Sequence, residues 1–250
     1  SYRIFMNTYD DFKTTKLFKL NVYPKPLESI KHDQEFTHVD DKQGDVSPNI
    51  RFKFFGASTT LQYTTIVPKT YGNDWLIGFF THVSKLLNKR KLTYSGVIKK
   101  IINSVTEAFD DDDEKQEVLL KLNKNKHVFN KTKVTQTTSL DSILNIINHK
   151  SYIFGLYDLE IICEYLDLNC IIVGKSSFII DGLYYMNANS NKYIILYFQR
   201  DTKTNYDTYY PIIQYKYRDP TQKKKLTNQQ YIYNEKDLPK KVSDHLEKFS

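Results

Sequence analysis

Residues 70–80 read Thr-Tyr-Gly-Asn-Asp-Trp-Leu-Ile-Gly-Phe-Phe, a polar turn that runs directly into an apolar, aromatic segment. From Trp75 to Leu87 the apolar side chains recur at steps of three and four residues, which predicts an amphipathic helix. Asn73 or Asp74 is placed to cap this helix, because short polar side chains accept hydrogen bonds from its first N–H groups. The stretch therefore predicts a turn that positions the start of a helix.

Strand patterns dominate the chain before this turn. Apolar and polar residues alternate in residues 18–22 and 52–54, and residues 61–67 are β-branched and aromatic. Residues 32–49 are polar, contain Gly and Pro, and are typical of an exposed loop. We predict a β-rich N-terminal extension over residues 1–65.

Helical and strand patterns follow one another after the turn. Helical spacing occurs in residues 97–105, 117–122, 140–147, 158–166 and 238–249. Strand patterns occur in residues 170–173, 178–180, 183–185, 193–198 and 210–217. The wholly apolar run 170–173 predicts a strand that is buried on both faces. This order of elements predicts an α+β fold.

The composition is that of a folded protein. The chain has 250 residues, of which 40% are hydrophobic, and its 20 Tyr and 15 Phe supply a core that a disordered chain would lack. No apolar run approaches the roughly 18 residues of a transmembrane helix, so we expect no membrane association. The abundance of Asn, Lys, Ile and Tyr is typical of an AT-rich genome, such as that of a virus or a unicellular parasite.

The net charge of +7 raises the possibility of nucleic-acid binding. Lysine supplies most of this charge and is scattered along the chain, with few arginines for bidentate contacts. Residues 85–91 and 121–133 could form a basic face, and tyrosines elsewhere could stack bases. Because solvated lysines explain these segments more simply, nucleic-acid binding is an alternative that we do not favour.

Two cysteines, Cys163 and Cys170, lie in apolar segments, and buried free thiols are the simplest interpretation. A zinc site would need a second Cys or His pair at suitable spacing. Gly174-Lys175-Ser176 follows a predicted strand, but Asn169 stands where a phosphate-binding loop needs its first Gly. The His-Glu-x-x-His motif is also missing, so we expect no metal or cofactor.

Three segments, in order, resemble motifs of the ovarian-tumour (OTU) family of cysteine proteases, which remove ubiquitin. Tyr71–Asp74 and the apolar helix after it are similar to the family's Asp-Gly-Asn-Cys motif, whose cysteine begins a helix. Residues 155–160, followed by the strand at 169–173, are similar to the middle motif. The strand at 193–198, followed by Asn205-Tyr206-Asp207, is similar to the last motif, which is His-Tyr-Asp or a variant of it.

The resemblance covers about residues 66–217. It implies an OTU-like core there, a mixed sheet flanked by helices. Residues 1–65 then form the N-terminal extension, and residues 218–250 form a tail with a terminal helix. Similar domains occur in large DNA viruses, in agreement with the composition.

The resemblance also implies a degenerate pocket. Asp74 stands where the family has its catalytic cysteine, or Trp75 does if the alignment shifts by one. Asn205 stands at the histidine position, or Tyr209 under a shifted alignment, and Asp207 stands at the third position. A carboxylate at a helix N-terminus is stabilised as an anion, which makes it a poor acyl nucleophile. Neither Asn nor Tyr takes up a proton near pH 7.

We therefore predict a non-catalytic pseudoenzyme module that acts as a protein-interaction or structural scaffold of a large DNA virus, in the host cytoplasm or the virion. The expected partner is a ubiquitin-like protein or a component of the virion or another assembly. One alternative is an active deubiquitinase-type cysteine hydrolase with a displaced nucleophile at Cys163 or Cys170. The other is a nucleic-acid-binding accessory domain.

Overall fold

The computed structural model describes residues 3–5, 42–44, 50–55, 61–89, 91–124, 138–174, 182–200, 207–217 and 226–247. The predicted strands at 18–22 and 178–180 and most of the predicted loop at 32–49 lie outside these residues.

The chain forms two compact units. The first unit comprises Ser1–Lys69, Leu166–Gln199 and Tyr209–Ser250, and the second comprises Thr70–Tyr165 and Arg200–Thr208. The predicted domain boundaries after residues 65 and 217 stay a prediction.

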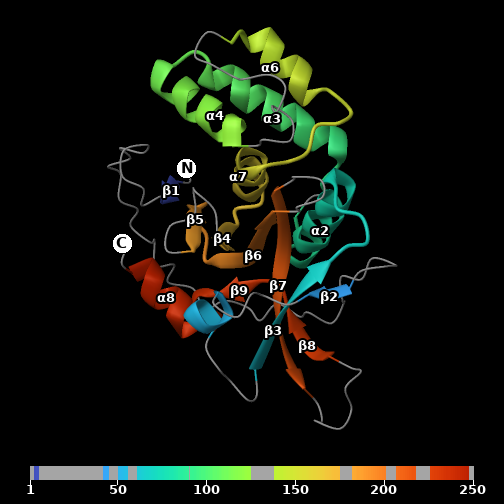
Figure 1. Cartoon of the computed structure of the whole chain (residues 1–250), viewed down its shortest axis with the longest axis vertical. Helices are drawn as coiled ribbons and strands as arrows, with labels where there is room; N and C mark the ends of the chain where they lie inside the picture. The colour runs from blue at the N-terminus through green and yellow to red at the C-terminus, as the bar shows by residue number, and fades with distance from the viewer. Residues whose placement is uncertain are drawn as a thin grey trace. The chain divides into compact units, whose positions relative to one another are not determined.

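The first unit is built on an open, mixed sheet whose described strands are joined in the order β1-β5-β4-β6-β7-β3-β2 (Figure 1). β8 pairs with β7, and β9 pairs with β6. β4 and β6 are parallel, whereas β4 and β5 are antiparallel, as are β3 and β7. The strands are β1 (Arg3–Phe5), β2 (Lys42–Gly44), β3 (Leu61–Val67), β4 (Asn169–Val173), β5 (Leu183–Asn187), β6 (Lys192–Arg200), β7 (Asp207–Tyr217), β8 (Leu226–Gln230) and β9 (Tyr233–Asn234). With the helices described below, this sheet confirms the predicted α+β class.

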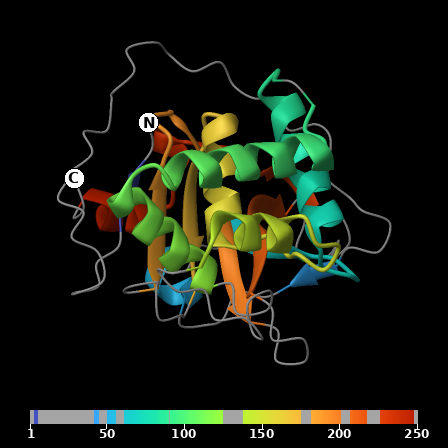
Figure 2. The same ribbon diagram turned by 90° about the horizontal axis from the view of Figure 1, so that it is seen from above.

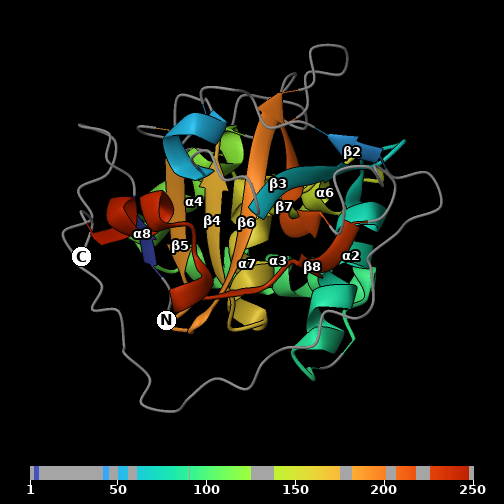
Figure 3. The same cartoon turned by 90° about the horizontal axis from the view of Figure 1, so that it is seen from below.

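Strand β4 lies between β5 and β6 (Figure 3). Cys170 is opposite Met186 of β5 and Ile194 of β6. All five residues of β4 are buried, which confirms the prediction that the wholly apolar run 170–173 is a buried strand. A strand with apolar residues on both faces is stable only where both faces are covered.

The core of the first unit joins the sheet to two short helical segments. These are η1 (Arg51–Phe55), a single π-helical turn, and α8 (Lys240–Leu246). Phe54 and Phe55 both belong to the hydrophobic core cluster, and the Phe54 ring centroid lies 4.9 Å from that of His245. The predicted strand at 52–54 is wrong, because adjacent residues of a strand point to opposite faces, whereas one helical turn brings both rings to the same core.

Gly174, directly after β4, allows a close approach of β6. A Cβ at this position would lie 2.8 Å from the carbonyl oxygen of Phe198 and 2.9 Å from its Cβ. We expect Gly174→Ala to lower the free energy of unfolding by about 3 kcal/mol in urea denaturation, because the backbone must shift to relieve the overlap. Gly72→Ala is the matched control, since a Cβ there meets nothing within 4 Å. Equal losses in the two variants would contradict this explanation.

The second unit is helical in its described residues. Its helices are α2 (Asn73–Leu86), α3 (Tyr94–Ala108), α4 (Asp112–Lys124), α6 (Leu140–Ile147) and α7 (Leu156–Tyr165). α7 contacts both α3 and α4, and its first eight residues are all buried (Figures 1 and 2). None of the described helices is long and apolar enough to span a membrane.

Side-chain caps begin three of these helices. Ser139 Oγ accepts a hydrogen bond from the Ser142 N–H at 3.3 Å, which confirms its predicted role at the start of α6. Thr93 caps α3 in the same way through the Gly96 N–H. Asp111 accepts hydrogen bonds from two N–H groups in the first turn of α4, each at 2.9 Å. Short polar side chains thus satisfy donors that a helix start leaves without an intrahelical partner.

Candidate functional site

The two predicted pocket residues at the start of α2 differ in exposure. Asp74 is exposed in the first helical turn, where the helix dipole stabilises a carboxylate. Trp75 is buried, with its ring centroid 6.4 Å from that of Phe79 in a stacked arrangement and 5.9 Å from that of Tyr71. Asp74 is therefore the residue that a partner can reach, and Trp75 is a packing residue.

Asn73 does not cap α2 with its side chain, and neither does Asp74. The N-cap position is Gly72, without a side-chain cap. The buried Asn73 side chain instead binds backbone far along the chain: Nδ2 donates to the Tyr152 carbonyl oxygen at 2.6 Å, and Oδ1 accepts from the Phe154 N–H at 2.8 Å. The predicted capping role is wrong, because the donor and the acceptor of this amide are both used to bind the backbone of Tyr152 and Phe154.

Residues Tyr152–Gly155, which we call the strap, are also held by Asp158. The Tyr152 hydroxyl donates to Asp158 Oδ1 at 2.6 Å, and the Gly155 N–H donates to Asp158 Oδ2 at 2.7 Å. Asp158 lies in the first turn of α7 and is 1% exposed. The strap thus has four hydrogen bonds to two buried side chains, Asn73 of α2 and Asp158 of α7. These bonds link two of the three segments that resemble OTU motifs.

Burial controls the protonation of Asp158 and Tyr152. It raises the pKa of Asp158 to about 7, although the hydrogen bonds from Tyr152 and Gly155 lower that pKa. Burial, together with the neighbouring Asp158, holds the pKa of the Tyr152 hydroxyl well above its ordinary value. Tyr152 therefore keeps its proton, whereas Asp158 changes its charge near neutral pH.

A buried ion pair joins α4 to α7. Lys121 Nζ lies 2.7 Å from Glu160 Oε2 and 2.7 Å from Glu117 Oε1. Lys121 and Glu160 are 5% and 0% exposed, whereas Glu117 is 38% exposed. Burial by itself lowers the pKa of Lys121, but the two carboxylates raise it, and the net pKa is above its ordinary value. Lys121 is therefore charged and does not contribute to the basic face suggested for residues 121–133, of which 125–137 lie outside the described residues.

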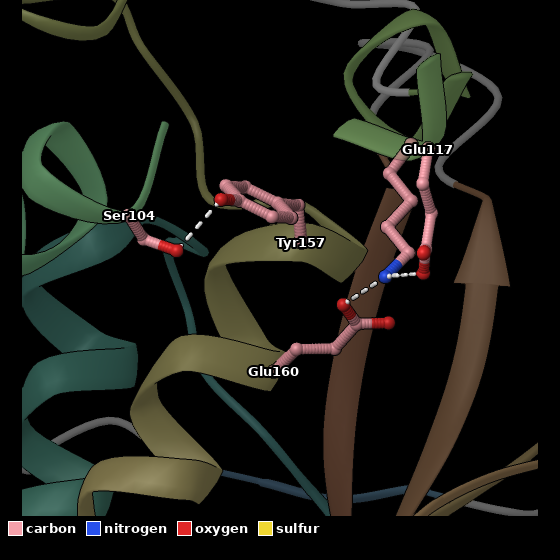
Figure 4. A network of polar contacts seen from close by, with 5 residues as sticks. Ser104, Glu117, Tyr157 and Glu160 are labelled. Atoms are coloured by element: carbon pink, nitrogen blue, oxygen red, sulfur yellow. Dashed lines mark hydrogen bonds and ion pairs between the residues drawn. The ribbon is translucent and has the colours of Figure 1, made fainter. Parts of the chain in front are cut away.

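Tyr157 extends this polar network toward α3. Its hydroxyl lies 2.8 Å from Ser104 Oγ, and Figure 4 shows the Tyr157–Ser104 contact next to Glu160 and Glu117. Lys121 Nζ lies 5.9 Å from the centroid of the Tyr157 ring. The Tyr157–Ser104 hydrogen bond thus connects α7 to α3, and the Lys121–Glu160 ion pair connects α7 to α4.

Asp207, the third predicted pocket residue that the structure describes, begins β7 and is buried. Arg200 Nε and Nη2 both donate to Asp207 Oδ1, at 2.9 and 2.7 Å. Asn205 lies outside the described residues. Among the residues with described positions, no hydrogen bond or ion pair joins Asp74 to Asp207. The Arg200 guanidinium thus neutralises the carboxylate that the resemblance assigns to orienting a histidine.

Both thiols are free and buried, as predicted. Cys163 of α7 is 1% exposed, and Cys170 of β4 is 0% exposed. A macromolecular substrate cannot reach either sulfur in this conformation. Within the described part of the chain, no group of three or more His, Cys, Asp or Glu side chains is arranged to hold a metal ion.

No protein-family model matches this chain, and no curated protein is significantly similar to it. The OTU-like resemblance therefore depends on the three motifs alone and stays a hypothesis.

Sequence reasoning missed the partners of Asp158, Glu160 and Lys121, although the sequence holds a signal for them. Asp158 and Glu160 lie within the otherwise apolar and aromatic run 156–163, and Lys121 lies within Val-Leu-Leu-Lys-Leu. Charged residues are seldom fully buried without a partner. Charges inside a buried helix therefore indicate partners, but the sequence does not say which ones.

Proposed function

We propose that the protein is a non-catalytic module with an OTU-like core, which acts as a protein-interaction or structural scaffold of a large DNA virus. The observation that carries this proposal is the start of α2. The position assigned to the nucleophile holds the exposed carboxylate of Asp74, on a turn that Asn73 anchors to the strap. Such a turn offers a fixed polar contact to a polypeptide and no acyl nucleophile.

Two further observations support a binding role over a catalytic one. Asp207 forms an ion pair with Arg200, which neutralises its carboxylate. Cys163 and Cys170 are buried in the core. The proposed partner is a ubiquitin-like protein or a component of the virion or another assembly, met in the host cytoplasm or in the virion. Residues 1–65 are proposed to form a β-rich extension that packs on the core or on a neighbouring protein.

Titration with ubiquitin, ubiquitin chains and virion proteins tests the proposal. We expect saturable binding to one of them that Asp74→Lys weakens about tenfold, which corresponds to about 1.4 kcal/mol for reversing a charge in the contact. Asp141→Lys is the matched control, because Asp141 is also an exposed carboxylate in a first helical turn, that of α6. The proposal is abandoned if none of these proteins binds saturably, or if both variants weaken binding equally.

The catalytic alternative is distinguished by a ubiquitin probe that carries a cysteine-reactive group, with intact mass as the readout. An adduct that disappears in Cys163→Ala or Cys170→Ala would favour a displaced nucleophile. The nucleic-acid alternative would be favoured instead by an affinity that falls steeply as the salt concentration rises.

A further inference from the structure

We propose that the strap, Tyr152–Gly155, is a proton-controlled latch in which the charge of Asp158 sets how tightly the strap is held between α2 and α7. The geometry makes Asp158 the central acceptor. Its two carboxylate oxygens accept hydrogen bonds from the Tyr152 hydroxyl and the Gly155 N–H. Asn73 binds the same short segment through hydrogen bonds to the backbone of Tyr152 and Phe154.

Within the described residues, hydrogen bonds but no ion pair stabilise a negative charge on Asp158. In the described residues, the donors to its carboxylate are the Tyr152 hydroxyl and the backbone N–H groups of Gly155 and of Asp158 itself, and all three are neutral. The neighbouring carboxylate of Glu160 raises the pKa of Asp158 further. The ion pairs of Lys121 are with Glu160 and Glu117.

The remaining ionisable groups that face this site are tyrosines. Tyr157 of α7 interacts electrostatically with Asp158, and Tyr94 of α3 interacts with Tyr152. The Tyr94 ring also stacks on Phe154 of the strap, with 6.0 Å between ring centroids. Burial raises the pKa of Tyr157, as it does that of Tyr152, so both hydroxyls stay neutral through the range in which Asp158 titrates.

The direction of the pH effect follows from the two states of Asp158. In the closed strap burial raises its pKa to about 7, whereas an Asp158 released into water returns toward its ordinary value of 3.8. Between these pH values the closed form keeps a proton that the open form gives up. Each pH unit of increase therefore favours opening about tenfold. The effect levels off above about pH 7, where the closed form is ionised too.

Opening the strap would release Asn73 from Tyr152 and Phe154. Because Asn73 is the first residue of α2, the latch controls how firmly the turn that presents Asp74 is anchored. The latch does not depend on whether the protein binds a ubiquitin-like partner.

Hydrogen exchange of the Phe154 and Gly155 amides between pH 4.5 and 8 tests the latch in the intact chain. After correction for base-catalysed exchange, we expect their protection factors to fall about tenfold per pH unit up to about pH 6.5 and then to level off. In Asp158→Asn, which carries no charge at any pH, we expect a flat profile. Asp141→Asn, on the exposed surface of α6, should retain the wild-type profile.

Hydrogen exchange at the amide of Ile101, a buried residue in the middle of α3, distinguishes local opening of the strap from a change in global stability. If Ile101 loses protection in parallel with the strap, opening is global and the latch is overturned. A flat wild-type profile, or a pH dependence that persists in Asp158→Asn, overturns it as well. If Asp158→Asn does not fold, the carboxyl ¹³C shift of Asp158 in the wild type decides. A midpoint near pH 7 supports the latch, and one near pH 4 contradicts it.

Discussion

Lys121→Met is expected to lower the free energy of unfolding by about 3 to 5 kcal/mol, because it leaves a buried carboxylate without its cation. Lys121 is 5% exposed and Glu160 is 0% exposed, with 2.7 Å between the ammonium nitrogen and the carboxylate oxygen. Methionine fills a similar volume, so the loss measures charge rather than packing. Urea denaturation followed by circular dichroism gives the value.

The cluster supplies its own controls. Glu117→Gln removes the other ion pair of Lys121, but Glu117 is 38% exposed, so we expect a loss of about 0.5 kcal/mol or less. The double variant Lys121→Met/Glu160→Leu removes both buried charges and should recover most of the stability. If Lys121→Met and Glu117→Gln were equally destabilising, the buried pair would not be the dominant interaction. If the double variant were as unstable as Lys121→Met alone, packing would explain the loss.

Asn73→Ala is expected to lower the free energy of unfolding by about 2 to 5 kcal/mol. It removes a donor from the Tyr152 carbonyl and an acceptor from the Phe154 N–H, both buried. A buried backbone group that loses its only side-chain partner costs about 1 to 3 kcal/mol. Urea denaturation measures the total loss, and hydrogen exchange at Phe154 shows whether the strap is the part that opens.

Asn103→Ala is the matched control for this prediction. Asn103 is also a helical asparagine, on α3, but its side chain is exposed. We expect no loss there, since alanine has a higher helix propensity than asparagine. The role assigned to Asn73 would be refuted by a loss below 1 kcal/mol, or by unchanged exchange at Phe154 in a destabilised Asn73→Ala.

Several local elements were predictable because their patterns allow one interpretation. Ser139 followed by helical spacing gives α6 with its cap, and the wholly apolar run 170–173 gives a buried strand. The strand predicted at residues 52–54 was wrong because two phenylalanines separated by one residue fit either a strand or one helical turn. The choice depended on Phe55 and on the core formed with α8, which lies almost 190 residues further along the chain.

The candidate site was only partly predictable. The turn before α2 was placed correctly, and the exposure of Asp74 agrees with a helix start. The partners of Asn73 lie 79 and 81 residues away in sequence, however, so no local pattern indicates them. The pairing of Asp207 with Arg200 spans seven residues, but it requires the ends of β6 and β7 to be side by side.

By itself, the sequence determined the α+β class, the start of α2 and the burial of the two cysteines. These features depend on residue identity and on short-range periodicity, which a single segment contains. Only the tertiary structure decided which polar side chains are buried and which partners they have. A buried charge is stabilised by groups that other elements bring to within about 3 Å. The roles of Asn73, Asp158 and Lys121 therefore emerge only when α2, α4, α7 and the strap are packed together.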